Sequence, residues 1–133
     1  MPVTYTIDTK ERVIRTRCMG MLRLAEVVEH FRELERDPEC TDRLDVLLDL
    51  SEVKTLPNAS QIRAASLEVK KIQKKVRFEA CAIVAVTDAL FGMLRMFEVM
   101  TQDYFRAIRV FRATAEAEEW LRLQRQQPSP ARP

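Results

Sequence analysis

The chain has 133 residues, a length typical of one globular domain. Hydrophobic residues make up 47% of it and charged residues 32%, a balance that supports one hydrophobic core. The net charge of +2 requires no polyanionic partner, so nucleic-acid binding is not expected, and two glycines are too few for a phosphate-binding glycine loop.

Three widely spaced cysteines, Cys18, Cys40 and Cys81, form no Cys-x-x-Cys pair, so we expect no redox or zinc chemistry. Reduced and buried thiols are typical of the cytosol. The first residues lack the basic segment and apolar run of a signal peptide, and no stretch reaches the roughly 18 apolar residues of a membrane span. We therefore predict a cytoplasmic protein, with no cofactor.

Two alternating segments at the start of the chain predict an antiparallel hairpin of strands 3–8 and 13–18, joined by a polar turn. Apolar residues then recur at helical spacing over 24–36, which predicts an amphipathic helix. Arg23 stands where a capping Ser, Thr or Asp is expected. The apolar run 45–50 predicts a strand buried in the middle of a sheet, followed by a loop over 51–57.

A second helix is predicted from Asn58, which forms a capping-box pair with Gln61. Its apolar face is expected to turn inward, and its basic face, which also carries Glu68, outward. The apolar run 78–86 predicts the next parallel strand. A third helix over about 89–104, a short strand over 107–111 and a fourth helix capped by Thr114 complete the pattern.

The element order β-β-α-β-α-β-α-β-α predicts an α/β domain with a single mixed sheet of about five strands and helices packed on it. The pattern does not determine the order of the strands across the sheet. We expect this domain to span residues 1–123. Residues 124–133 are rich in proline and lack an apolar pattern, so they are expected to form a disordered tail.

Several segments together resemble the SpoIIAA-like branch of the STAS superfamily over about residues 4–123: the turn Cys18-Met19-Gly20-Met21-Leu22, the strand LLDLSEV, and the runs AIVAVTDALFGMLRMFEVM and RVFRATAEAEEWL. The resemblance implies a STAS-like mixed sheet, which has also been compared with CRAL-TRIO lipid-binding domains. It also implies a bacterial protein, since members of this branch are mostly uncharacterised bacterial proteins. Better understood relatives are anti-sigma-factor antagonists, which bind a partner kinase and are switched by phosphorylation of a serine.

That serine lies in an Asp-Ser-Ser-Gly-like turn at the start of the helix after the central strand. The corresponding residues here are 56–60, LPNAS, and the acceptor position falls on Ala59 or Asn58. Ser60 matches only if the alignment slips by one residue, and the Asp and Gly of the turn are missing. The phosphorylation switch is therefore not carried over, and Ser60 is the only candidate acceptor.

Polar residues near the ends of two predicted parallel strands form a candidate site, with Asp49 and Ser51 on one strand and Thr87 and Asp88 after the next. Two neighbouring carboxylates could share a proton or hold a metal. The simpler interpretation is that Thr87 or Asp88 caps the third helix and that Asp49 binds loop amides. We therefore expect no metal site and no catalysis here.

The predicted helix 89–104 is apolar on most sides, so more than the sheet must cover it. Neighbouring elements, a second subunit or an apolar ligand could do so. Methionine is common at adaptable binding surfaces, and Gly92 would permit close approach of another backbone. The candidate interface or ligand-binding residues are Phe91, Gly92, Met93, Met96, Phe97 and Met100.

Two further features are interpreted as structural. The basic face of the second helix has no aromatic residues interleaved for stacking on bases, so we interpret it as a solvated surface. His30, the only histidine, has no companions at the spacing of a catalytic triad or a metal site.

The sequence therefore favours a non-catalytic regulatory or protein-interaction module, homodimeric through helix 89–104, with an unknown protein partner. The alternative is a binder or carrier of an apolar or lipid-like ligand in a Met-lined pocket beside the same helix. An enzyme that uses Asp49 and Asp88 is the third class. It is not favoured, because the sequence contains no recognisable nucleophile–base pair, metal cluster or phosphate loop.

Overall fold

The structure is a computed structural model that describes residues 2–126. Its five strands form one sheet in the order β1-β2-β3-β4-β5. β1 (Val3–Asp8) runs antiparallel to β2 (Val13–Gly20), whereas β2, β3 (Asp45–Val53), β4 (Ala80–Val84) and β5 (Ala107–Phe111) are parallel. The predicted α/β fold with a mixed sheet is confirmed, and the strand order is sequential.

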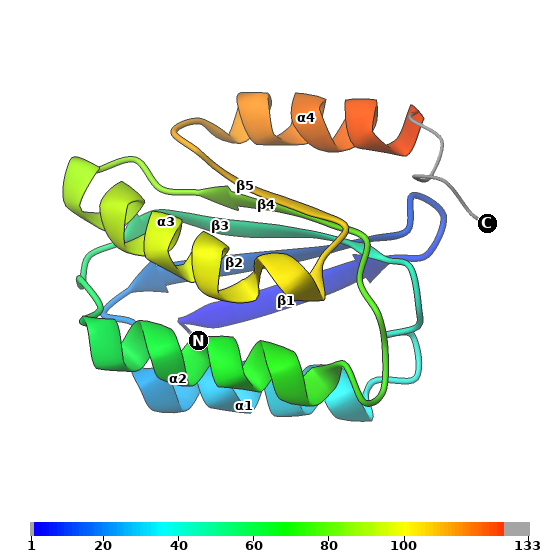
Figure 1. The fold of residues 1–133 in the computed structure, drawn as a ribbon, viewed down its shortest axis with the longest axis horizontal. Coiled ribbons are helices and arrows are strands. Elements are labelled where there is room, and N and C mark those ends of the chain that lie inside the picture. The colour runs from blue at the N-terminus through cyan, green and yellow to red at the C-terminus, as the bar shows by residue number, and fades with distance from the viewer. Residues whose placement is uncertain (1, 127–133) are drawn as a thin grey trace.

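Four helices cover the two faces of the sheet: α1 (Leu24–Arg36), α2 (Ala59–Ile72), α3 (Asp88–Thr101) and α4 (Thr114–Gln126). Figure 1 shows α1, α2 and α3 on one face and α4 on the other. This arrangement follows from the strand order, because successive crossovers of one hand place their helices on the same side. None of the helices within residues 2–126 is long and apolar enough to cross a membrane.

Each face of the sheet has its own hydrophobic cluster. The larger cluster lies between the sheet and α1–α3 and includes the fully buried Ile14, Ile72 and Ile83. The smaller cluster lies under α4 and includes Val13 and Ala117. Neighbouring strand residues such as Val13 and Ile14 belong to different clusters because successive side chains point to opposite faces.

The starts of α2 and α3 are capped as predicted, whereas the start of α4 differs from the prediction. Asn58 Oδ1 accepts from Gln61 N at 2.8 Å, and Gln61 Oε1 accepts from Asn58 N at 2.9 Å, which confirms the predicted capping box. Thr87 Oγ1 accepts from Leu90 N and caps α3. Thr114 is itself the first residue of α4 rather than its cap.

Some boundaries differ from the prediction. β3 does not end at Leu50 but continues to Val53, because β2 remains paired with it beyond a bulge, through Gly20 opposite Val53. β4 is shorter than 78–86, and its bounds coincide with its pairing to β5, which runs from Ala80 opposite Ala107 to Val84 opposite Phe111. α3 ends at Thr101, whose hydroxyl donates to Phe97 O, and a 3₁₀ turn, Gln102–Tyr104, follows.

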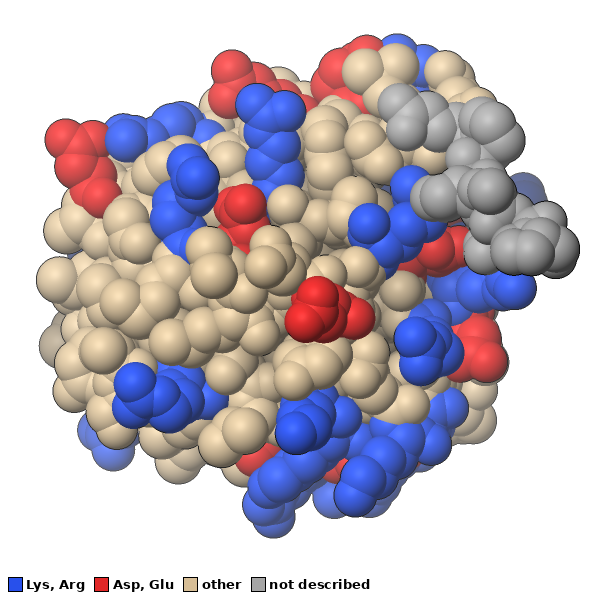
Figure 2. All heavy atoms as spheres, viewed as in Figure 1, with Lys and Arg blue, Asp and Glu red and all other residues tan. Residues whose placement is uncertain are grey.

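The predicted outward face of α2 is only partly exposed. Glu68 is buried, contrary to the prediction, because α2 packs between α1 and α3. Lys75, just beyond the helix, donates to the carbonyl oxygens at the end of α1 and so stabilises that terminus. Figure 2 shows Lys and Arg side chains along the lower edge of the molecule, where α2 lies. The exposed basic residues of α2 are Arg63, Lys70 and Lys71.

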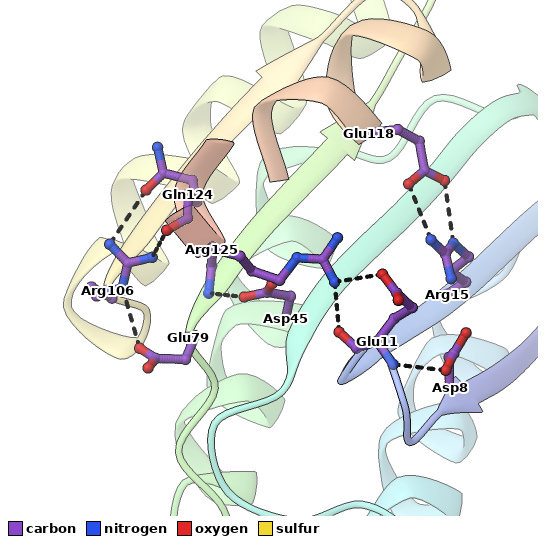
Figure 3. A network of polar contacts seen from close by, with 10 residues as sticks. Asp8, Glu11, Arg15, Asp45, Glu79, Arg106, Glu118, Gln124 and Arg125 are labelled. Atoms are coloured by element: carbon purple, nitrogen blue, oxygen red, sulfur yellow. Dashed lines mark hydrogen bonds and ion pairs between the residues drawn. The ribbon is translucent and has the colours of Figure 1, made fainter. Parts of the chain in front are cut away.

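The last turn of α4 is held to the sheet by polar contacts (Figure 3). Arg125 donates to Glu11 O at 2.6 Å, and its Nε lies 3.9 Å from the buried carboxylate of Asp45. Arg106 donates to the side chain of Gln124. Residues 124–126, expected to begin the tail, are therefore helical, and the remainder of the predicted tail, 127–133, lies outside the described residues.

Candidate functional site

A cavity of about 500 Å³ opens between the sheet and the three helices α1–α3. Its floor is the face of the sheet that carries the larger hydrophobic cluster. It extends toward the edge where the parallel strands end and where α1, α2 and α3 begin (Figure 1). The floor is formed by Val3, Thr16, Cys18, Leu48, Leu50 and Ile83.

The helices supply the other walls, and their contribution is almost entirely apolar. The inward faces predicted for α1 and α2 from helical spacing are the faces that line the cavity. A small residue, Ala65, stands where a longer side chain would fill the space. The helix residues that line the walls are Leu24, Val27, His30 and Phe31 of α1, Gln61, Ile62 and Ala65 of α2, and Leu90, Leu94 and Phe97 of α3.

Two loops form the mouth of the cavity and are bonded to each other. Lys54 N donates to Gly20 O at 2.8 Å, and Thr55 Oγ1 donates to Leu22 O at 3.1 Å. Both Arg23 and Leu56 line the cavity and are exposed, which locates the opening at these loops. Gly20 has a φ of +66°, a conformation that glycine adopts without strain, so the turn into this loop depends on it.

A small polar group lies inside the apolar cavity. Thr16 Oγ1 is 3.2 Å from His30 Nε2, and both residues are buried. Burial lowers the pKa of His30 to about 4, so its imidazole is neutral at pH 7. Burial, followed by the nearby Asp49 charge, raises the pKa of Cys18 to about 12, so its thiol stays protonated. None of these groups is ionised at neutral pH.

The second ring nitrogen of His30 has no hydrogen-bond partner. Nδ1 is buried and unsatisfied within the described residues. Tyr5 packs edge-on against the His30 ring, with centroids 5.3 Å apart. The Phe31 ring is tilted against the same imidazole, with centroids 5.6 Å apart. His30 is thus held in an aromatic environment that favours its neutral form, and it is a cavity residue as well as a structural one.

Most of the residues predicted on α3 do not line this cavity. Met93, Met96 and Met100 are half-buried and pack against the larger cluster, but they do not line the cavity. Phe97 is the one predicted residue of this group that lines it. Phe91 is half-buried beneath the Arg112 guanidinium, and Gly92 is exposed with open space where a Cβ would lie. The α3 residues that line the cavity are thus Leu90, Leu94 and Phe97, and the predicted ligand-binding role of the methionines stays a prediction.

The predicted polar site is not assembled. Asp49 lies within β3, where strand alternation places it on the face toward α4, and its Oδ1 accepts from Ser51 N. Asp88 begins α3 on the other face and pairs with Arg112 at 2.6 Å. Thr87 caps α3, as the simpler interpretation predicts. Within residues 2–126, no cluster of three or more His, Cys, Asp or Glu side chains is placed to hold a metal ion.

The remaining polar features do not add to the cavity. Ser60 is exposed on the first turn of α2 and does not line it. A second hollow lies at the opposite edge of the sheet, and three of its charged side chains are already bonded: Arg106 pairs with Glu79 at 3.3 Å, and Asp42 accepts from Arg77 N. That hollow is part of the polar network that holds α4.

The chain is similar in structure to an uncharacterised protein of the DUF3478 family from Shewanella loihica PV-4, which is described as having a SpoIIAA-like fold. The TM-score is 0.58, with 17% sequence identity over 90% of this chain and 91% of that one. The fold is SpoIIAA-like. No protein-family model and no curated protein sequence matches the chain. The SpoIIAA-like fold thus confirms the architecture inferred from the sequence.

Within this SpoIIAA-like domain, one residue of the sequence signals the mouth of the cavity. Arg23 is anomalous as the residue that precedes a helix, and the structure shows why it is tolerated. Glu26 Oε1 accepts from Arg23 N at 2.8 Å, one of the hydrogen bonds of a capping box, and Arg23 is an exposed residue that lines the mouth of the cavity. Chemically, the arrangement offers an apolar volume with neutral hydrogen-bonding groups inside and a cation at its opening.

Proposed function

We propose that this protein is a non-catalytic module that binds a small apolar ligand in the cavity between the sheet and α1–α3. The cavity is the observation that carries the proposal. Its volume of about 500 Å³ lies in the range of ligand sites, roughly 300–1,000 Å³, and its walls are mainly aliphatic and aromatic.

The size of the cavity supports a bound occupant. Protein interiors are close-packed, with few voids larger than a water molecule. A space of about 500 Å³ that is lined by apolar side chains is therefore far larger than the voids that close packing leaves in a protein interior. Water could enter through the mouth, but the apolar walls offer it few hydrogen-bond partners. An apolar molecule would gain by displacing it.

The polar group in the cavity supports binding rather than catalysis. Thr16 and His30 resemble a hydroxyl–imidazole pair, but the low pKa of His30 makes it a weak base at neutral pH. Among the described residues, no group bonds Nδ1 and orients the imidazole, as a carboxylate does in hydrolytic triads. Burial also raises the pKa of Cys18, so its thiol stays protonated and is a poor nucleophile.

Titration with decan-1-ol, followed by native mass spectrometry and calorimetry, tests the proposal. Ala65→Phe places a ring in the cavity and is expected to weaken binding at least tenfold. Leu67→Phe is the matched control, because Leu67 lies on the same helix, is 51% exposed and does not line the cavity. Wild-type protein that takes up no alcohol, or equal binding by wild type and Ala65→Phe, would overturn the proposal.

A homodimer through α3 is the second candidate. One observation favours it: Val99, on α3, is 61% exposed, and Gly92 leaves the helix surface open for close approach. We expect sedimentation equilibrium to give a dimer mass that falls to the monomer in Met96→Glu. A wild-type protein that remains monomeric at high concentration would refute this candidate without affecting the cavity proposal.

A further inference from the structure

The cavity lining carries formal charge of one sign only, and that charge is positive. Arg23 is the only Asp, Glu, Lys or Arg among the described residues that line it. The Arg23 guanidinium makes no ion pair within residues 2–126. A cation at the mouth of an apolar cavity, without an internal partner, is available to a ligand.

The position of Arg23 relative to the mouth is well defined by its neighbours. It follows Leu22 directly, and Leu22 O is bonded to Thr55 of the opposite loop. Lys54, on that same loop, is exposed and also forms no ion pair within the described part of the chain. Two cationic side chains therefore lie on loops that hydrogen bonds hold together.

The carboxylate of Glu26, in the first turn of α1, already accepts a hydrogen bond. Glu26 accepts a hydrogen bond from the Arg23 backbone N, not from its guanidinium. The first turns of α1 and α2 also point toward this edge (Figure 1), so their backbone dipoles add positive potential at the mouth. The inside of the cavity, by contrast, contains no ionised group at neutral pH, because Cys18 is protonated and His30 is neutral.

We propose that the ligand is an anionic amphiphile, whose apolar body occupies the cavity and whose carboxylate or phosphate is held at the mouth by Arg23. This inference rests on the proposed function and adds the charge of the ligand to it. A planar guanidinium can bind either oxyanion through two parallel hydrogen bonds. The interior favours the apolar body of the ligand, because a charged group placed there would lose its hydration and find no counter-ion.

A series of ligands with one chain length tests the head group separately from the chain. Decan-1-ol, decanoate and decyl phosphate are titrated calorimetrically at pH 7.5 and low salt, below their micelle concentrations. Wild-type protein is expected to bind decanoate about tenfold more tightly than decan-1-ol. Tight binding of decyl phosphate as well would place phosphorylated lipids in the same class, whereas decanoate alone would indicate fatty acids.

Arg23→Gln is the decisive variant. It is expected to remove the tenfold preference for the anion, measured as the ratio of the affinities for decanoate and decan-1-ol. Lys10→Gln is the charge-matched control, because Lys10 lies in the exposed turn between β1 and β2 and does not line the cavity. The preference in wild type is also expected to shrink in high salt, since an exposed cation is screened.

The outcomes separate the two proposals. If no member of the series binds, the proposed function fails. If alcohol and acid bind equally, the function stands and the anionic head group is refuted. If Arg23→Gln retains the preference for the acid, the assignment to Arg23 is overturned.

Discussion

Acid should destabilise this protein through His30, and the effect can be calculated from the structure. The side chain is 5% exposed and surrounded by Tyr5, Phe31 and Thr16. Desolvation lowers its pKa from 6.5 to about 4 in the folded state. Below pH 6.5 the unfolded chain therefore binds a proton that the folded protein does not, and the free energy of unfolding falls as the pH falls toward 4.

The magnitude follows from the two pKa values. The full difference is about 3 kcal/mol, and about 2 kcal/mol of it is lost between pH 7 and pH 5. Below the folded-state pKa of about 4 both states are protonated, so this contribution no longer changes with pH. Stability from His30 is thus fully present above pH 6.5.

Urea unfolding of the ligand-free protein at pH 7 and pH 5 measures this difference. His30→Gln is the matched variant, because the amide can still bond Thr16 but does not titrate. Carboxylates contribute equally to both proteins, so the difference between their pH dependences isolates His30. Since His30 is the only histidine, its ring signal in an NMR titration also reports the folded-state pKa directly.

Two results would refute the reasoning. Equal pH dependence of wild type and His30→Gln would show that His30 does not couple folding to protons. An NMR midpoint near 6.5 would show that the ring is hydrated rather than desolvated, which would place water inside the cavity beside it.

Three further predictions concern the fold. Arg125→Ala should lower the free energy of unfolding by about 1–2 kcal/mol, because it removes the bond to Glu11 and the cation near buried Asp45; Arg122→Ala, at an exposed pair on the same helix, should change urea stability by less than about 0.5 kcal/mol. Asn58→Ala should cost about 1 kcal/mol in the same assay through loss of the α2 cap, and an unchanged midpoint would contradict the capping role. Cys18, Cys40 and Cys81 are all buried and free. Thiol titration with a disulfide reagent should therefore find no fast-reacting cysteine in the native protein and three after denaturation, and a fast reaction of the native protein would refute this.

Local patterns in the sequence were enough to predict the elements and their order. α1 and β5 have the predicted bounds, 24–36 and 107–111, because their apolar periodicities and flanking residues are local signals. The capping of α2 was predictable for the same reason. Where neighbouring strands or helices decide a boundary, the pattern was insufficient: β3 extends to Val53 through pairing with β2, and Glu68 is buried because α2 has helices on both sides.

The functional site required the tertiary structure. Asp49 and Asp88 were candidates for a shared polar site, although the simpler interpretation was favoured; strand alternation places Asp49 toward α4, whereas Asp88 begins α3 on the other face of the sheet. The cavity arises where the side chains of three helices fail to fill the space above the sheet, and that shortfall depends on how far apart the elements pack. No local pattern contains those spacings. The sequence therefore identified the apolar faces of α1, α2 and α3, and only their packing decided that they enclose a space with Arg23 at its mouth.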